Sequence, residues 1–297
     1  MTVAAARGLW FASARSAELR SEAVGDPQEG EVLVRALYSL VSAGTEMNVY
    51  RGEAVSALEV GLPTRKGQFP FPIQFGYQVL GRVEVAGTNA RYAEGGLVFC
   101  QHPHQDRFVI ATDFVYPVVA GLSPRAAAFS NLCNVALNCH LDVPVRLGDC
   151  CVVSGLGVIG TFAAHLARKT AATLVLVDPL PARRRFAQSV GADAVVSPDE
   201  AVAAVEELSD GRGADVYIEA SGAPEALQTA LACTGVEGTV AVISYYGSRP
   251  AQLTLSPEFH LRRQRIVSSM VGMVGSGLQP RWDKRRGWPP RCTSSRK

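Results

Sequence analysis

The chain has 297 residues, 47% of them hydrophobic and 19% charged, which is the composition of a folded globular protein long enough for two domains. No stretch reaches the length of a membrane span and no secretory signal is recognisable, so we expect a cytoplasmic protein without a membrane partner. The formal net charge is only +2 and its basic excess lies in residues 281–297, so we expect no nucleic-acid partner.

Residues 1–122 are predicted to form an all-β module. Short β-prone runs are separated by turns rich in Gly, Pro and acidic residues, and only brief helices fit between them. The expected strands lie at 32–38, 81–85, 97–100 and 107–110. From Ser123 the pattern changes to a serine cap followed by proline and alanines, which predicts a bridging helix that runs to about His140.

Residues 123–272 are predicted to form a second domain, in which strands and helices alternate. Strands are expected at 150–155, 173–178, 194–197, 214–221, 238–246 and 265–271, with helices at 158–170, 180–190, 199–208, 224–233 and 257–263. This alternation predicts a parallel, doubly wound sheet with right-handed crossovers. The fold class is therefore α/β.

The first strand of the second domain ends in a glycine-rich turn. Gly155, Gly157 and Gly160 stand at the G-x-G-x-x-G spacing, and the next strand ends in Asp178, where an acid can hold a ribose. The spacing and its context predict a dinucleotide site; the alternative is a structural turn that binds nothing. We expect NAD, with NADP less favoured because the carboxylate of Asp178 would repel a 2′-phosphate.

Later strands of this domain contribute further candidate cofactor contacts. Ser221 and Gly222 end the fourth strand and Tyr245 ends the fifth, at the carboxyl edge where open α/β sheets bind ligands. The tyrosine could stack on the nicotinamide or simply pack against the protein. The predicted cofactor-binding residues are Gly155, Leu156, Gly157, Val158, Ile159, Gly160, Asp178, Ser221, Gly222 and Tyr245.

The order of the domains and four short motifs resemble the medium-chain dehydrogenase/reductase superfamily. The motifs are Ser42-Ala-Gly-Thr-Glu-Met-Asn-Val-Tyr-Arg-Gly52, Phe75-Gly-Tyr-Gln-Val-Leu-Gly-Arg-Val, Gly155-Leu-Gly-Val-Ile-Gly160 and Gly191-Ala-Asp-Ala. The resemblance covers nearly the whole chain. It implies that residues 1–122 are a GroES-like catalytic domain, that residues 123–272 are a Rossmann domain that binds NAD, and that the active site lies between them.

The chain departs from the zinc-dependent members of that superfamily. The positions of two zinc ligands hold Ala43 and Tyr77, neither of which is a usual zinc donor, and Gln78 follows where those members have Glu. The four-cysteine structural zinc lobe is missing as well. The resemblance is therefore to a zinc-free branch, with motifs like those of bacteriochlorophyllide dehydrogenase-like proteins, and we expect no metal cofactor.

The resemblance implies four catalytic residues. Thr45 matches the proton-relay hydroxyl of the family, Glu46 matches an acidic position, and Tyr77 could present its phenol to the substrate oxygen. Asn131 could bond to substrate or to the nicotinamide carboxamide. Each has a structural alternative: Thr45 and Asn131 can satisfy local backbone groups, Tyr77 can fill the vacated metal pocket and Glu46 can pair with an arginine.

The segment Cys100-Gln-His102-Pro-His104 suggests a metal site, because alternate residues of a strand share a face. Two observations disfavour it: Pro103 interrupts an extended ladder, and no fourth ligand is identifiable. The alternatives are a histidine that lines the active-site cleft and ordinary loop histidines.

Residues 273–297 are predicted to be an irregular tail. The chain runs into Gly287-Trp-Pro-Pro-Arg-Cys without hydrophobic period or helix caps, as a frameshift or an early stop would produce. We therefore expect a C-terminus that is truncated relative to members of the family. A homodimer is a further expectation.

These features favour a zinc-independent, NAD-dependent oxidoreductase that moves hydride between nicotinamide and an alcohol or carbonyl substrate. One alternative is an NADPH-dependent quinone or enoyl reductase. Another is a nucleotide-binding remnant without turnover. Cofactor preference distinguishes the two enzymes, and turnover distinguishes both of them from the remnant.

Overall fold

The computed structural model describes residues 4–54, 65–279 and 281–282. Over these described residues the chain divides between Asn131 and Leu132 into two compact units, unit 1 before this point and unit 2 after it. Unit 1 is antiparallel and unit 2 contains a parallel six-stranded sheet, so the predicted GroES-like module followed by a Rossmann fold is confirmed. The domain boundary predicted at residue 122 stays a prediction. Within the described residues, no helix is both long and apolar enough to span a bilayer.

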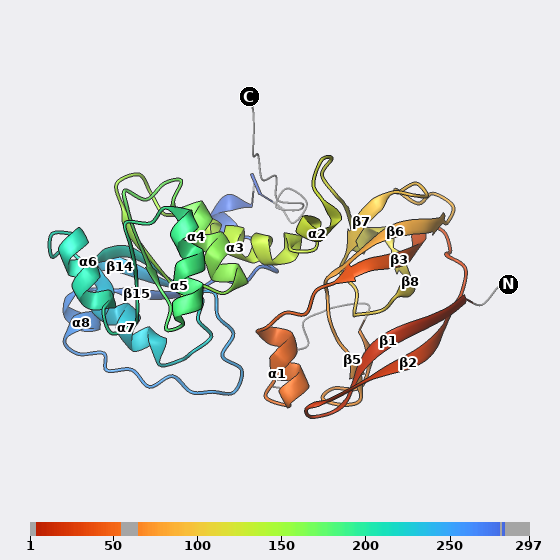
Figure 1. Cartoon of the computed structure of the whole chain (residues 1–297), viewed down its shortest axis with the longest axis horizontal. Helices are drawn as coiled ribbons and strands as arrows, with labels where there is room; N and C mark the ends of the chain where they lie inside the picture. The colour runs from red at the N-terminus through yellow and green to blue at the C-terminus, as the bar shows by residue number, and fades with distance from the viewer. Residues whose placement is uncertain (1–3, 55–64, 280, 283–297) are drawn as a thin grey trace. The chain divides into compact units, whose positions relative to one another are not determined.

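Unit 1 consists of two antiparallel sheets, ordered β2-β1-β5-β4 and β8-β3-β6-β7-β9 (Figure 1). The strands are β1 (Ala4–Ser13), β2 (Ser16–Val24), β3 (Glu31–Ser39), β4 (Lys66–Gly67), β5 (Ile73–Gln74), β6 (Val79–Ala86), β7 (Leu97–Cys100), β8 (Arg107–Ala111) and β9 (Val115–Pro117), with the helix α1 (Thr45–Arg51) after β3. The second sheet contains all four strands expected from the sequence. Its inward side chains, such as Val34, Val83 and Phe108, form one apolar core.

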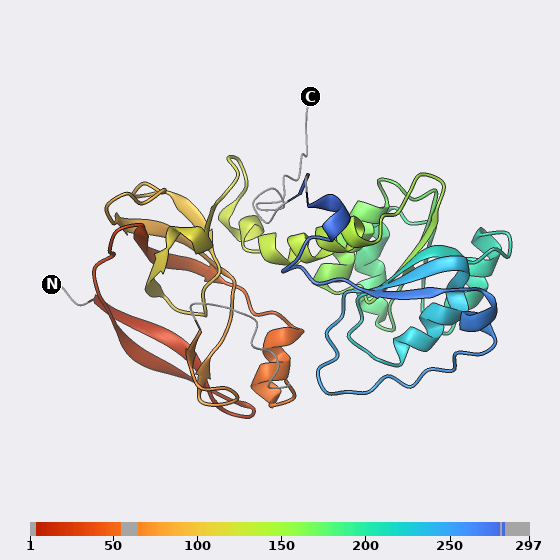
Figure 2. The same ribbon diagram turned by 180° about the vertical axis from the view of Figure 1, so that it is seen from behind.

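The hairpin of β1 and β2 is not predicted by the sequence pattern (Figure 2). Its strands pair from Ala4 opposite Val24 to Ser13 opposite Ser16. Within β2 only Val24 is buried, so this strand lacks the clear alternation of buried and exposed residues that identifies a half-buried strand. Backbone pairing with β1 therefore contributes more to its place in the sheet than side-chain burial does.

The predicted helix from Ser123 to His140 is in fact two helices. The first, α2 (Pro124–Ala127), is capped by Ser123, whose Oγ accepts a hydrogen bond from the N–H of Ala126 at 3.2 Å. The second, α3 (Ser130–Asp142), follows after a short break. The hydroxyl of Ser130 donates to the carbonyl of Ala127 at 2.7 Å and so links the two helices.

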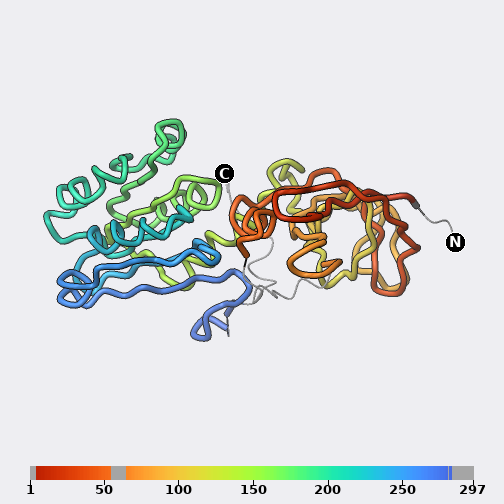
Figure 3. The backbone as a smooth tube through the Cα atoms, turned by 90° about the horizontal axis from the view of Figure 1, so that it is seen from below, coloured from red at the N-terminus to blue at the C-terminus, as the bar shows by residue number. Residues whose placement is uncertain are grey.

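Unit 2 is a parallel sheet ordered β12-β11-β10-β13-β14-β15, in which β14 and β15 run side by side at one edge (Figures 1 and 3). Its strands are β10 (Cys150–Ser154), β11 (Thr173–Val177), β12 (Ala194–Val196), β13 (Ala214–Glu219), β14 (Thr234–Val242) and β15 (Arg265–Ser268), and its helices after α3 are α4 (Val158–Ala167), α5 (Pro181–Ala187), α6 (Ala201–Leu208), α7 (Ala226–Cys233) and α8 (Glu258–Leu261). Each predicted strand and helix has its counterpart. The strand order reverses between β10 and β13, which is the point where sheets of this kind bind ligands.

Alternate residues of β10 enter different cores. Cys151 and Val153 pack with residues of α3 and α4, whereas Cys150 and Val152 pack with residues of α6 and α7. A parallel strand that is covered on both faces needs apolar residues throughout, and β10 is buried along its whole length. Burial on both faces also fixes the position of the turn that follows β10.

Two glycines of that turn are required by the packing of the backbone. A Cβ on Gly160, in α4, would lie 1.9 Å from the carbonyl oxygen of Gly155. Gly155 has a φ of +84°, and its Cβ would lie 2.3 Å from the Cα of Ser221. A Cβ on Gly157, in contrast, would meet no atom within 4 Å. Two of the three glycines thus serve the fold, and the third borders open space.

We expect Gly160→Ala to destabilise the protein by about 3 kcal/mol, since the new methyl group overlaps backbone that cannot move away. Gly157→Ala is the matched control and should cost only about 0.5 kcal/mol, the difference between two residues at a helix N-cap. Urea denaturation of both variants measures the two values. Equal losses of stability would contradict the packing argument.

Candidate active site

The turn between β10 and α4 leaves open space beside the start of α4. Gly157 is the N-cap of this helix, no side chain caps it, and its first turn holds no acidic residue. Backbone N–H groups at a helix start attract anions such as a pyrophosphate, and the space that a Cβ on Gly157 would enter is available to one. Leu156 and Ile159 pack into the core, while Val158 is 45% exposed. The turn therefore fits a dinucleotide, although its individual contacts stay predictions.

Asp178, directly after β11, is buried against this turn. Its Oδ2 accepts a hydrogen bond from the N–H of Leu156 at 2.7 Å, and its Oδ1 accepts one from the N–H of Leu180 at 2.8 Å. The guanidinium of Arg183 lies 3.4 Å from Oδ2. The carboxylate thus joins the glycine turn to the loop after β11. Its side chain is 0% exposed, so its use as a ribose acceptor stays a prediction.

A second buried carboxylate, Glu219, organises the end of β13. Its Oε1 accepts hydrogen bonds from the N–H of Ser221 at 2.7 Å and from the Ser221 hydroxyl, and its Oε2 accepts one from the hydroxyl of Tyr246. Burial and the adjacent carboxylate raise the pKa of Tyr246 above its ordinary value. The sequence did not predict Glu219 as a site residue, and of the two adjacent tyrosines the predicted contact was Tyr245 and not Tyr246. The available signal was an acid as the last residue of a strand buried on both faces.

The segment after β14 is hydrogen-bonded to the turn after β13. Gly222 has a φ of +73°, its N–H donates to Ser244 Oγ at 2.8 Å, and its carbonyl accepts from the guanidinium of Arg249 at 2.6 Å. The predicted residue Tyr245 lies in this segment and is partly buried. Its neighbour Tyr246 makes the bond to the buried carboxylate, and the contact of Tyr245 with the cofactor stays a prediction.

In unit 1, three hydroxyl groups lie together near the start of α1. The phenol of Tyr77, just before β6, is hydrogen-bonded to the side chains of Ser42 and Thr45. Burial raises the pKa of Tyr77 well above its ordinary value, the carboxylate of Glu46 raises it further, and the two hydrogen bonds oppose this rise. Tyr77 is therefore a neutral phenol at pH 7. The structure thus brings together three of the four predicted catalytic residues, Thr45, Glu46 and Tyr77.

Glu46 is bonded to a histidine and not to an arginine. Its Oε2 lies 2.6 Å from Nε2 of His104, and the two side chains are 0% and 6% exposed. The other ring nitrogen of His104, Nδ1, is hydrogen-bonded to Oγ of Ser39 at the end of β3. Gly76 has a φ of +140°, and a Cβ on it would lie 2.8 Å from Nε2 of His104. This glycine therefore leaves the space that the imidazole occupies.

The two remaining candidates of unit 1 are His102 and Asn131. His102 is buried and stacks on Phe108 with their ring centroids 3.8 Å apart, and its Nδ1 lies 2.9 Å from the carbonyl oxygen of Pro103. Burial lowers the pKa of His102 to about 3, so it is a neutral histidine of the core. Asn131 is buried at the start of α3, and its contact with substrate or cofactor stays a prediction.

Known dehydrogenases resemble the chain over most of its length. A family model described as zinc-binding dehydrogenase matches residues 158–284. D-guloside 3-dehydrogenase of Escherichia coli K12 is 29% identical over 274 residues, which cover 86% of this chain and 78% of that protein. L-threonine 3-dehydrogenase of Pyrococcus horikoshii is 26% identical over 300 residues, which cover 90% and 82%. A protein of Sinorhizobium meliloti 1021, solved bound to NADP, has the same fold with a TM-score of 0.76 at 19% identity, and the match covers 96% of this chain and 87% of that one.

The chain is a dehydrogenase of the medium-chain dehydrogenase/reductase superfamily. The superfamily that the sequence motifs predicted is therefore confirmed. The prediction that this medium-chain dehydrogenase uses a nicotinamide dinucleotide, NAD or NADP, is confirmed as well. The finer assignments, a preference for NAD and a zinc-free branch, remain proposals.

The zinc-binding members of the superfamily raise the question of a metal in this dehydrogenase. The matched residues 158–284 do not include Ala43 or Tyr77, the two residues that the sequence resemblance predicts at zinc-ligand positions. Beside Tyr77 the structure offers hydroxyl groups and the Glu46 carboxylate, one oxygen of which is already bonded to His104. In the part of the chain that the structure describes, no three His, Cys, Asp or Glu side chains are grouped so as to hold a metal ion. The donors around Tyr77 therefore do not fit zinc.

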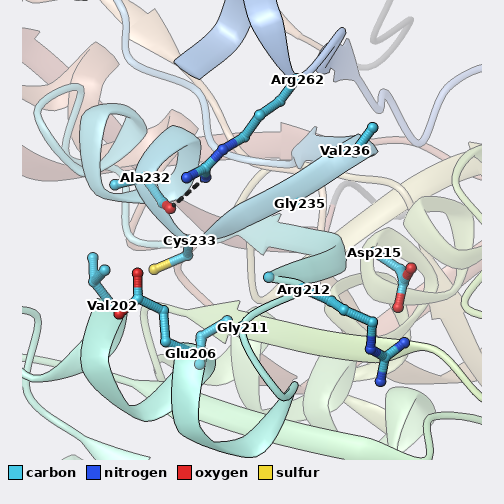
Figure 4. A pocket seen from close by; sticks show the side chains of 12 residues that line it. Val202, Glu206, Gly211, Arg212, Asp215, Ala232, Cys233, Gly235, Val236 and Arg262 are labelled. Carbon is cyan, nitrogen blue, oxygen red and sulfur yellow. Dashed lines mark hydrogen bonds between the residues drawn. The ribbon is translucent and has the colours of Figure 1, made fainter. Parts of the chain in front are cut away.

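A cavity of about 350 Å³ in unit 2 lies away from the cofactor turn (Figure 4). Its lining includes Glu206, Arg212, Cys233 and Arg262. These residues surround the amino ends of β13 and β14, whereas parallel sheets bind cofactors at the carboxyl ends. The guanidinium of Arg262 donates to the carbonyl of Ala232 at 3.1 Å and so serves the fold. This cavity takes no part in the medium-chain dehydrogenase site described above.

We expect the free energy of unfolding to fall by about 2 kcal/mol between pH 7 and pH 5 because of His102. Its pKa is about 3 in the fold and about 6.5 in an unfolded chain, so below pH 6.5 only the unfolded state binds the proton. His102→Asn keeps an amide near Pro103 and removes the titration. Urea denaturation at both pH values should show a smaller fall in the variant, and an identical fall would contradict the assignment.

Proposed function

We propose that the chain is an NAD-dependent, zinc-independent dehydrogenase that interconverts an alcohol or polyol and the corresponding carbonyl compound. The observation that carries the proposal is the cluster of Ser42, Thr45 and Tyr77 hydroxyls, with Tyr77 at a position that holds a zinc ligand in zinc-dependent members. D-guloside and L-threonine, the substrates named for two relatives, both carry hydroxyl groups, which supports a hydroxyl compound as the substrate class.

In this proposal the hydroxyl cluster replaces the metal as the group that holds the substrate oxygen. A neutral phenol can donate a hydrogen bond to an oxygen on which negative charge develops, and the raised pKa keeps Tyr77 in that form at pH 7. Thr45 supplies a second hydroxyl to the same oxygen. The nicotinamide, when bound, accepts or supplies the hydride. The protein supplies hydrogen bonds and a route for the proton.

The cofactor part of the proposal rests on the surroundings of the glycine turn. A carboxylate at the end of β11, that of Asp178, opposes the 2′-phosphate of NADP more than the plain ribose of NAD. Arg183, 3.4 Å from this carboxylate, acts in the opposite direction because a guanidinium attracts phosphate. Asp178 is buried, whereas the Arg183 side chain is 50% exposed, so water screens the charge of the arginine more than that of the carboxylate.

The proposed activity can be tested by following nicotinamide absorbance with the purified chain against alcohols, polyols, ketones, quinones and enones. We expect oxidation of alcohols with NAD. Reduction of quinones or enones with NADPH instead would support the reductase alternative. Cofactor binding without turnover of any compound would support a nucleotide-binding remnant, and either result would contradict the proposal.

We expect NADH to bind at least about tenfold more tightly than NADPH, which corresponds to about 1.4 kcal/mol. Asp178→Asn should narrow this difference, because it removes the charge that repels a 2′-phosphate. Asp193→Asn is the matched control, since the Asp193 carboxylate also accepts a backbone hydrogen bond in unit 2, from Leu174 at 2.8 Å. Fluorescence titration with both cofactors measures the ratio of the two dissociation constants. Tighter binding of NADPH than of NADH to the wild-type protein would contradict the proposed preference for NAD.

We also expect turnover to survive prolonged dialysis against a zinc chelator, because the donors around Tyr77 are too few for a tetrahedral catalytic site. Elemental analysis before and after dialysis reports the zinc content. A zinc-dependent alcohol dehydrogenase treated in parallel shows that the chelation worked. Stoichiometric zinc whose removal abolishes turnover, and whose return restores it, would overturn zinc independence.

A further inference from the structure

A line of hydrogen bonds leads from Glu46, whose charge acts on Tyr77 of the hydroxyl cluster, to the surface of unit 1. Glu46 is the innermost member, with 0% exposure, and its Oε2 lies 2.6 Å from Nε2 of His104. Nδ1 of His104 is bonded to Oγ of Ser39, which is exposed at the end of β3. The line therefore begins beside Tyr77 and ends at solvent.

The inner end of this line has an open acceptor. Oε1 of Glu46 is buried and has no hydrogen-bond partner among the described residues. An unpaired carboxylate oxygen is costly to bury, and one beside a catalytic cluster is placed to receive a proton. The carboxylate is near enough to Tyr77 for its charge to raise the pKa of that phenol. In the proposed reaction, Oε1 of Glu46 therefore lies near the substrate oxygen.

We propose that Glu46, His104 and Ser39 form the path by which the proton of the substrate hydroxyl reaches solvent. The proposal rests on the proposed alcohol dehydrogenase activity, because oxidation of an alcohol by NAD releases one proton. A phenol that is neutral at pH 7 does not accept that proton, so the cluster needs another group to take it. The buried carboxylate and imidazole are such a group.

The step balances with one proton entering the line and one leaving it. At the start, one proton lies in the hydrogen bond between Glu46 Oε2 and His104 Nε2, and Nδ1–H donates to Ser39. When the substrate O–H bond breaks, its proton moves to Oε1 of Glu46, the shared proton stays on Nε2, the Nδ1 proton moves to Ser39 Oγ, and the Ser39 hydroxyl proton passes to water. The C–H electron pair leaves as hydride to the oxidised nicotinamide, and the alcohol becomes a carbonyl. The carboxyl group of Glu46 then rotates and the imidazole of His104 exchanges its protons, which restores the initial protonation state of the pair.

The test compares turnover of variants on whichever alcohol the wild-type protein oxidises. His104→Gln can still bond to Glu46 and Ser39 but cannot pass a proton, so we expect kcat to fall roughly 100-fold with unchanged NAD affinity. In His104→Ala, added imidazole should restore turnover, because the space beside Gly76 can hold the ring. Imidazole should not restore His104→Gln, whose side chain fills that space. His260→Gln, an exposed histidine on α8, is the control and should keep wild-type turnover.

A readout without substrate accompanies the kinetics. The proton shared between Glu46 and His104 should give a downfield imidazole N–H signal in proton NMR of the cofactor-free protein, and both Glu46→Gln and His104→Gln should lack it. A His104→Gln protein that keeps kcat within about twofold, or a folded His104→Ala protein that imidazole does not restore, would overturn the relay while leaving the dehydrogenase activity in place. A wild-type protein that shows the signal and oxidises no alcohol would overturn the proposed function, and the relay with it.

Discussion

The close approach of two backbone segments, at Gly155 and Ser221, is the constraint on which the cofactor edge of unit 2 depends. A single methyl group on Gly155 would lie 2.3 Å from the Cα of Ser221, so the turn after β10 and the turn after β13 can share this space only as bare backbone. Each turn is also held by a buried carboxylate. Asp178 accepts from the turn after β10, and Glu219 accepts from the turn after β13. The glycine turn is thus fixed on both sides, which suits its proposed role in binding the dinucleotide, because a site that is rigid in advance loses less entropy on binding.

Unit 1 meets a different physical demand, since its buried carboxylate has one oxygen without a hydrogen-bond partner within the described ranges of the chain, whereas Asp178 and Glu219 of unit 2 accept hydrogen bonds through both oxygens. A carboxylate removed from water is costly unless it is paired, and Glu46 is paired through only one of its oxygens. A fold selected for stability alone would pair both oxygens or replace the acid with an apolar residue. The hydroxyl groups of Ser42, Thr45 and Tyr77 lie next to this half-satisfied carboxylate. This arrangement supports the proposed catalytic role of the cluster, because groups that serve catalysis commonly lower the stability of a fold.

Most of the fold could be predicted from the sequence, because the strands and helices of unit 2 have clear sequence patterns. Its strands include apolar runs such as 150–154, buried on both faces, and several of its helices begin at a glycine or a proline. The hairpin of β1 and β2 could not be predicted, since only Val24 of β2 is buried. The candidate site divides in the same way. The glycine turn has a fixed spacing, whereas the pairing of Glu46 with His104 joins residues 58 positions apart, and no local pattern records it.

Tyr246 illustrates a finer limit of sequence reasoning. Two tyrosines follow β14, and only the fold decides which of them reaches the carboxylate of Glu219. Neighbouring residues in an irregular segment point in directions that periodicity does not determine, because the segment has no regular period. A strand or a helix, in contrast, assigns each side chain to a face, which is why the core residues of β10 could be predicted and this contact could not.

The contact between Gly76 and His104 ties together two positions that look independent in the sequence. A Cβ at residue 76 would lie within 2.8 Å of the imidazole, so no larger residue can enter there while the histidine stays where it is. A smaller residue at position 104 removes this steric overlap, whereas the φ of +140° at position 76 still favours glycine. Among natural variants of this protein, a side chain at position 76 should therefore occur only alongside a smaller residue at position 104. A mutant library that varies either position alone would miss every such combination, whereas one that varies both together would include it.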